Sequence, residues 1–167
     1  PDIAKGFEQR KDLLFVGGFG HPPNVDGILW FVKEIFPIIQ NEIQDIKLHV
    51  VGSKPPKEVL ALQSDSIIIT GFVNDEKLAE YYATCRVTVI PLRYGAGVKG
   101  KLLETCYFQL PPVITRVASE GIPDIEKYCI IEDNASDFAL KTINLYNDII
   151  LWNKQQEKSK KLIQNNY

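Results

Sequence analysis

Short runs of apolar residues alternate along the chain with longer segments in which apolar residues recur at helical spacing. The short runs are rich in β-branched residues and several end at glycine, which is typical of buried strands. They comprise residues 13–16, 48–51, 67–69, 87–90, 112–115 and 128–131. Alternation with helical segments indicates right-handed βαβ units. The pattern predicts an α/β domain, a Rossmann-like doubly wound parallel sheet of about six strands with helices on both faces.

Several of the predicted helices carry recognisable start signals. Asn24 and Asn74 are typical N-cap residues, and each precedes a segment whose apolar residues follow helical spacing. From Ser136 onward the spacing predicts helix through Ile149, followed by a Lys-rich tail.

Length and composition fit a single globular domain. The chain has 167 residues, of which 45% are hydrophobic and 24% are charged, as in ordinary soluble proteins. The formal net charge of −2 argues against a nucleic-acid partner held by bulk positive charge. No stretch approaches the roughly 18 apolar residues of a membrane span, and no signal peptide is seen, so a cytoplasmic protein is expected. We expect a linker over residues 1–11, a core over 12–150 and a C-terminal helix or tail over 151–167.

Other residue types narrow the classes of function. The chain has no methionine and begins at Pro1, which indicates a piece of a longer polypeptide. Cys85, Cys106 and Cys129 lack C-x-x-C spacing and are predicted to be reduced, mostly buried thiols. No metal-ligand cluster, Ser-His-Asp order or Walker A lysine is found, so zinc, hydrolase and P-loop chemistry are not expected.

One loop, residues 91–104, concentrates the candidate chemistry. It reads PLRYGAGVKGKLLE and follows the fourth predicted strand. Its glycines allow the backbone to approach a ligand closely, and it leads into a helix N-terminus that favours an anion. Lys99 and Lys101 add positive charge, with Arg93 as a third cation. We therefore predict a phosphate or diphosphate site, beside which Glu104 is placed to accept hydrogen bonds from sugar hydroxyls.

The same loop allows two other interpretations. Gly95, Gly97 and Gly100 form the dinucleotide spacing G-x-G-x-x-G, with Glu120 about 20 residues further on as a ribose-binding acid. The motif follows the fourth strand rather than the first, which makes it weak evidence. An NAD-type dinucleotide-binding domain nevertheless remains an alternative, as does a flexible loop with surface lysines.

The segment from Val87 to Pro123 resembles the donor-binding core of family-four retaining glycosyltransferases of the GT-B fold. A variant of that family has the pattern Arg-x-Gly-Ala-Gly-x-Lys-x-Lys-x-x-Glu, which matches residues 93–104. Further segments that resemble family motifs in the same order are FVGGFGHPPNVDGILW (15–30), VVGS (50–53), TGFV (70–73) and SEGI (119–122). The resemblance covers roughly residues 12–150 and implies the C-terminal, nucleotide-sugar-binding half of a GT-B enzyme.

The resemblance also implies a set of donor contacts, without assigning a catalytic residue. Glu104 is expected to hold the ribose hydroxyls, the backbone N–H groups of residues 98–100 to face the diphosphate, and residues 72–73 to lie beside the base. The predicted donor-binding residues are Gly18, His21, Phe72, Val73, Arg93, Gly97, Val98, Lys99, Gly100, Lys101, Glu104 and Glu120.

The sequence departs from the family pattern in two places. The family often has a Glu-x7-Glu pair, and Ala96 stands where its first carboxylate would touch the donor sugar. The stretch 18–23 also lacks the Arg and Lys that often bind the phosphates. We hypothesise that Lys99 and Lys101 supply the missing charge. Ala96 leaves a further alternative, a non-catalytic nucleotide-binding module.

The resemblance implies transfer from a nucleotide-diphosphate sugar with retention of configuration, and with no metal ion or other cofactor. It implies that a separate N-terminal domain, missing from this chain, recognises the acceptor and closes over the donor domain. The isolated chain is thus expected to bind donor weakly and to transfer nothing. No nucleic-acid partner is expected, and membrane association is expected only through the missing half.

Overall fold

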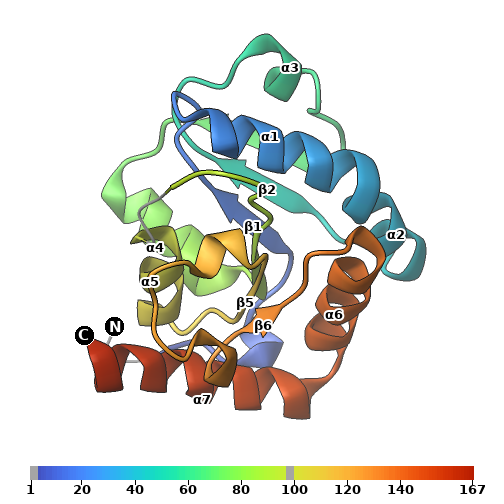
Figure 1. Ribbon diagram of the computed structural model, residues 1–167. Coiled ribbons are helices and arrows are strands. Elements are labelled where there is room, and N and C mark those ends of the chain that lie inside the picture. Colours follow the sequence, from blue (N-terminus) through green and yellow to red (C-terminus); the bar gives the residue numbers. More distant parts are fainter. Residues whose placement is uncertain (1–3, 97–99) are drawn as a thin grey trace.

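The computed structural model describes residues 4–96 and 100–167. Its strands are β1 (Leu13–Val16), β2 (Leu48–Val51), β3 (Ile67–Gly71), β4 (Val87–Ile90), β5 (Pro112–Ile114) and β6 (Ile130–Ile131). They form one sheet in the order β3-β2-β1-β4-β5-β6, and all neighbouring pairs are parallel (Figure 1). This order is that of a Rossmann fold, which confirms the predicted doubly wound parallel sheet.

Helices cover both faces of this sheet. They are α1 (Pro22–Trp30), α2 (Phe36–Glu42), α3 (Lys57–Leu60), α4 (Asp75–Thr84), α5 (Gly100–Tyr107), α6 (Ala135–Asn147) and α7 (Ile149–Asn166). α1, α2 and α6 pack on the face to which Leu13 and Phe15 contribute. α4 and the residues that follow α5 lie on the opposite face with Leu14, and α7 packs against α5 (Figure 1). The strands are therefore buried on both sides, which explains their continuous apolar runs.

The first helix begins earlier than predicted. His21 is the N-cap, and Pro22 and Pro23 occupy the first turn, where the missing N–H of proline has no partner to lose. Asn24, the predicted N-cap, lies inside that turn, and its Nδ2 donates to the carbonyl oxygen of Gly18 at 2.8 Å. The side chain of Asn24 therefore ties the loop after β1 to α1 instead of capping the helix.

The predicted helix from Ser136 is interrupted at Asp148. This residue is extended, and its carboxylate accepts hydrogen bonds from the N–H groups of Ile150 and Leu151 at 3.0 and 3.1 Å. Asp148 thus ends α6 and caps α7, because its side chain competes with the helical backbone for these donors. α7 then packs on the domain with Trp152 fully buried.

The segment before β1 is held by a buried cation. Arg10 is 2% exposed and donates to the backbone carbonyls of Lys5, Tyr82, Cys85 and Phe108 at 2.8–3.2 Å. Burial lowers the pKa of Arg10 to about 10, so the guanidinium remains charged at neutral pH. Charge-assisted bonds of this kind are the strong ones, and here they join the start of the chain to the end of α4 and to the residue after α5.

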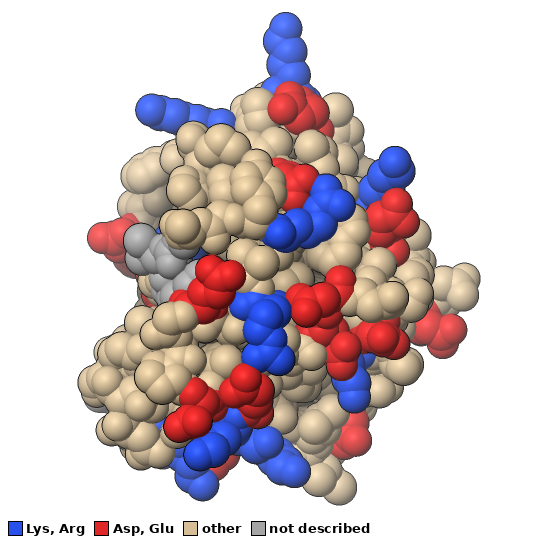
Figure 2. Space-filling view, in the orientation of Figure 1, with Lys and Arg blue, Asp and Glu red and all other residues tan. Residues whose placement is uncertain are grey.

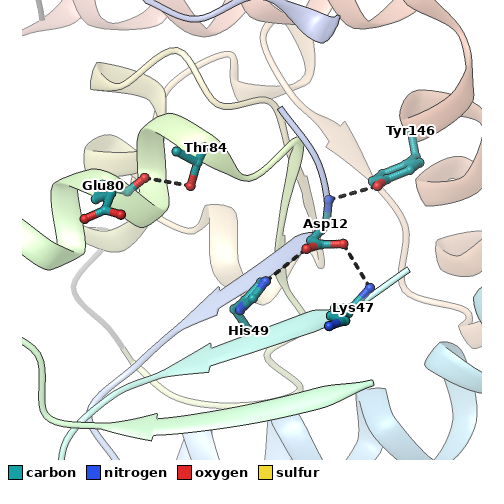
Figure 3. Close-up of polar contacts among 6 residues, drawn as sticks. All are labelled: Asp12, Lys47, His49, Glu80, Thr84 and Tyr146. Atoms are coloured by element: carbon teal, nitrogen blue, oxygen red, sulfur yellow. Dashed lines mark hydrogen bonds and ion pairs between the residues drawn. The ribbon is translucent and has the colours of Figure 1, made fainter. Parts of the chain in front are cut away.

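A polar cluster lies at the amino ends of β1 and β2 (Figure 3). The carboxylate of Asp12 accepts hydrogen bonds from His49 Nε2 and from the N–H of Lys47, both at 3.1 Å. The N–H of Asp12 donates to the hydroxyl of Tyr146 in α6 at 2.8 Å. Burial opposes ionisation of Asp12, yet the bonds from His49 and Lys47 outweigh it and lower the pKa of Asp12 below its ordinary value of 3.8.

Asp12→Asn is expected to lower the free energy of unfolding near neutral pH by about 1–3 kcal/mol and to weaken its dependence on acid. Because the folded-state pKa is lowered, the stabilisation by the carboxylate is present above the unfolded-state pKa of about 3.9 and is lost as the pH falls through the folded value. Urea titrations from neutral pH to about pH 3 measure this, with the exposed Asp65→Asn as control. Equal acid dependence in wild type and Asp12→Asn would contradict it.

Candidate functional site

A cavity of about 560 Å³ lies at the carboxyl ends of β1 and β4. It is lined by Phe15, Val16, His21, Pro23, Asn24, Ile90, Leu92, Tyr94, Gly95, Ala96, Gly100, Lys101, Leu102, Glu104 and Ala118. β1 and β4 are neighbours at the point where the strand order reverses. Ligands of doubly wound folds bind at this switch point, and the volume is that of a small-molecule site.

Close packing of α1 against residues 91–96 forms one wall of the cavity. A Cβ atom at Gly27 would lie 2.9 Å from the carbonyl oxygen of Pro91. Gly95 has a φ of +121°, and a Cβ there would lie 2.9 Å from Cγ of Pro23. Both positions therefore require glycine. Gly95, the first glycine of the G-x-G-x-x-G spacing, thus makes room for α1.

A bidentate ion pair ties the same loop to α1. Nε and Nη2 of Arg93 donate to the two carboxylate oxygens of Asp26 at 2.9 and 2.6 Å. The guanidinium also lies 5.5 Å from the ring centroid of Trp30, within the range of a cation–π contact. The bond from Arg93 lowers the pKa of Asp26. Arg93 therefore holds the loop, and a direct contact with the donor remains a prediction for it.

Glu104 and Lys101 stand on the first two turns of α5 and line the cavity. The carboxylate oxygen Oε2 of Glu104 accepts a hydrogen bond from the hydroxyl of Tyr82 in α4 at 3.2 Å. Nζ of Lys101 lies 3.7 Å from the same oxygen. The helix start thus presents one carboxylate and one ammonium group, together with the partial positive charge of its N-terminus.

The structure gathers part of the predicted donor-binding set. His21, Gly100, Lys101 and Glu104 line the cavity. Gly18, Phe72, Val73, Arg93 and Glu120 lie outside its lining, as defined by the described residues. Phe72 follows β3 and is 77% exposed. Gly97, Val98 and Lys99 fall outside the described residues, and the contacts of the whole set with a donor remain predictions.

The charged surface, the cysteines and the helices can be compared with what the sequence suggests about them. On the face seen in Figure 2, acidic and basic side chains are interspersed, as the small net charge suggests. Cys85, Cys106 and Cys129 are free and buried, as predicted. Within residues 4–96 and 100–167, no three His, Cys, Asp or Glu side chains form a group suited to a metal ion. No helix in that part of the chain combines the length and apolar character needed to cross a membrane.

Comparison with known proteins shows the family of this chain. The family model described as glycosyl transferases group 1 matches residues 10–148. The chain belongs to this family. A relative from Klebsiella pneumoniae, an uncharacterised 44.6 kDa protein in the cps region, is 31% identical over 118 residues. That match covers 66% of this chain and 30% of the relative, so it spans less than a third of the length of the relative.

Solved structures share the fold of this group 1 domain. TarM matches with a TM-score of 0.78 at 16% identity, over 100% of this chain and 34% of TarM. The C-terminal domain of a group 1 glycosyl transferase (LpcC) from Francisella tularensis has a TM-score of 0.75 at 18% identity, over 95% of this chain and 87% of that domain. WaaG, a glycosyltransferase involved in lipopolysaccharide biosynthesis, has a TM-score of 0.72 at 20% identity, over 94% of this chain and 43% of WaaG. The predicted resemblance to GT-B group 1 enzymes is confirmed.

Arg93→Lys is expected to speed hydrogen exchange of the amides of residues 94–96 by about two- to fivefold, because lysine cannot form the bidentate pair with Asp26. Exchange detected by NMR or mass spectrometry measures the change. Arg116→Lys is the matched control, since Arg116 pairs with Glu126 on the surface and leaves this loop untouched. Unchanged exchange in Arg93→Lys would show that packing around Gly27 and Gly95 holds the loop without the ion pair.

Proposed function

We propose that this chain is the donor-binding domain of a retaining glycosyltransferase, which moves a sugar from a nucleotide-diphosphate sugar to an acceptor. The observation that carries the proposal is the placement of Glu104 and Lys101 at the start of α5, in a cavity at the switch point of the sheet. A carboxylate suits ribose hydroxyls, and a helix N-terminus with a nearby cation suits a diphosphate. Membership of the group 1 family supports this assignment.

The chemistry expected of this site is electrostatic. When the anomeric C–O bond of the donor breaks, negative charge builds on the departing diphosphate. The N-terminal end of α5 and the ammonium group of Lys101 are placed to stabilise that charge, and a preorganised donor of this kind is typically worth about 2.7–4 kcal/mol in the transition state. The same groups then serve both donor binding and departure of the leaving group.

The acceptor is assigned to a further domain of the same polypeptide. This proposal is supported by the comparison with TarM and WaaG, of which the chain covers 34% and 43%. The donor domain alone then binds its nucleotide sugar weakly and transfers nothing, because the attacking hydroxyl group must be brought to the anomeric carbon by the other domain.

A second candidate function is that of a nucleotide-binding module without transfer activity. Ala96 favours it, because this residue lines the cavity at the position where the family often has a carboxylate for the donor sugar. The two candidates differ in turnover: the longer polypeptide that contains this domain releases nucleoside diphosphate in the presence of an acceptor under the first proposal and does not under the second.

Glu104→Ala is expected to weaken binding of the nucleotide sugar that the wild-type chain prefers until its saturation-transfer signal is lost from the screen. A ligand-detected NMR screen of UDP, GDP, ADP and CMP sugars, with NAD as control, measures this as saturation transfer that is present with wild type and lost in the variant. Glu80→Ala is the matched control, because Glu80 pairs with Lys77 at the same i, i+3 spacing on α4. Silence of the wild-type chain toward every nucleotide sugar at millimolar concentration, or a signal from NAD alone, would contradict donor binding.

Lys101→Ala is expected to weaken binding of the nucleoside diphosphate by about three- to tenfold and binding of the nucleoside by much less, since the main lost contact is with phosphate. Titrations that compare UDP with uridine, GDP with guanosine and ADP with adenosine measure the two affinities. Lys77→Ala removes an equivalent lysine from α4 and is expected to change neither. A hypothesis from the sequence gives Lys99 the same role, so Lys99→Ala with Lys101→Ala should have a larger effect than Lys101→Ala alone.

A further inference from the structure

Glu104 presents one engaged and one unengaged carboxylate oxygen to the cavity region. Oε2 accepts from the hydroxyl of Tyr82 at 3.2 Å and has Nζ of Lys101 at 3.7 Å. Within residues 4–96 and 100–167, Oε1 has no hydrogen-bond partner. The side chain of Glu104 is 36% exposed, and a glutamate so placed has several rotamers, which bring an entropic cost when one of them is selected on binding.

Tyr82 is among the most firmly held residues near the site. Its side chain is 1% exposed, and its ring stacks on Phe108 with centroids 5.2 Å apart and planes 6° apart. The backbone carbonyls of Tyr82 and Phe108 both accept hydrogen bonds from the buried Arg10, at 2.8 and 3.2 Å. The position of the phenol hydroxyl is therefore set by the core behind the cavity.

The protonation state of Tyr82 suits a permanent donor. Burial raises the pKa of Tyr82 far above its ordinary value of 10.0, and the negative charge and hydrogen bond of Glu104 raise it further. The phenol therefore keeps its proton at any physiological pH, and an ionised carboxylate can only accept it as a hydrogen bond. In this bond a neutral hydroxyl donates to a charged carboxylate. Such a bond contributes more to stability than one between two neutral groups.

We propose that Tyr82 is a positioning residue for recognition of the donor ribose. Its hydroxyl holds Oε2 of Glu104 and thereby selects the rotamer in which Oε1 remains available to a ribose hydroxyl. The inference rests on the proposed function, in which Glu104 binds the ribose. It adds that ribose affinity depends on a core residue of α4 that does not itself contact the nucleotide.

The test is Tyr82→Phe, which removes the hydroxyl and retains the stacked ring. UDP, GDP and ADP, each beside its 2′-deoxy and 3′-deoxy analogues, are titrated against wild type and variant. The variant is expected to bind the ribonucleotide that the wild type prefers about three- to tenfold more weakly. Binding of the deoxy analogue that has lost the Glu104 contact should change much less. Tyr81→Phe is the matched control, because Tyr81 is adjacent in α4 and its ring faces His49 and Lys77.

Two further variants make the test independent of a general loss of stability. Phe108→Leu removes the stacking partner but keeps the hydroxyl of Tyr82. It should lower nucleotide affinity less than Tyr82→Phe does, and again more for ribonucleotides than for the deoxy analogues. In a Glu104→Ala background, Tyr82→Phe should have no further effect, since its contribution passes through the carboxylate. Thermal unfolding of each variant establishes that it is folded at the titration temperature.

The outcomes separate this inference from the function on which it rests. If Tyr82→Phe weakens ribonucleotides and deoxy analogues equally, or changes neither, Tyr82 has only a packing role and the inference is wrong while the donor site stands. If the wild-type chain binds none of the three nucleotides, the donor-binding proposal fails and takes the inference with it.

Discussion

The site depends on a constraint of chain topology at the boundary between β1 and β4. Right-handed crossovers from these neighbouring strands carry the chain to opposite faces of the sheet, α1 to one face and α5 toward the other. The two connections separate as they leave the carboxyl ends of the strands, so a crevice opens between them. Both helices begin beside that crevice, and it therefore collects two helix N-termini and the loop residues that precede them.

Each side of the crevice is supported separately from behind. On the α1 side, Gly27 and Gly95 permit close packing of helix and loop, and the pair formed by Arg93 and Asp26 closes it. On the α5 side, Arg10 binds the carbonyls behind α4 and α5. Both walls are thus held by contacts within the protein itself, and such support from behind is what a preorganised site needs.

Much of the fold was predictable because its signals are local. Strands buried on both faces leave continuous apolar runs, and Asn74 caps α4 through a side-chain bond to Lys77 three residues away, so both were identified correctly. The start of α1 and the break between α6 and α7 were not. The side chain of Asn24 bonds to Gly18, six residues back, whereas that of Asp148 accepts from Ile150 and Leu151 and caps α7. Asn and Asp are good caps by residue type, so composition alone does not say at which of several such residues a helix begins or ends.

The same division explains which parts of the site were foreseeable. Glu104 and Lys101 belong to one loop and helix, so their closeness in space follows from their closeness in the sequence. The partner of Arg93 is 67 positions away and that of Glu104 is 22 positions away. Tyr81 and Tyr82 are the same residue type side by side, and the sequence alone does not distinguish their roles. In the folded chain, the burial that makes Tyr82 a core residue also keeps its hydroxyl protonated and fixed, so the core itself supplies a hydrogen-bond donor to the site.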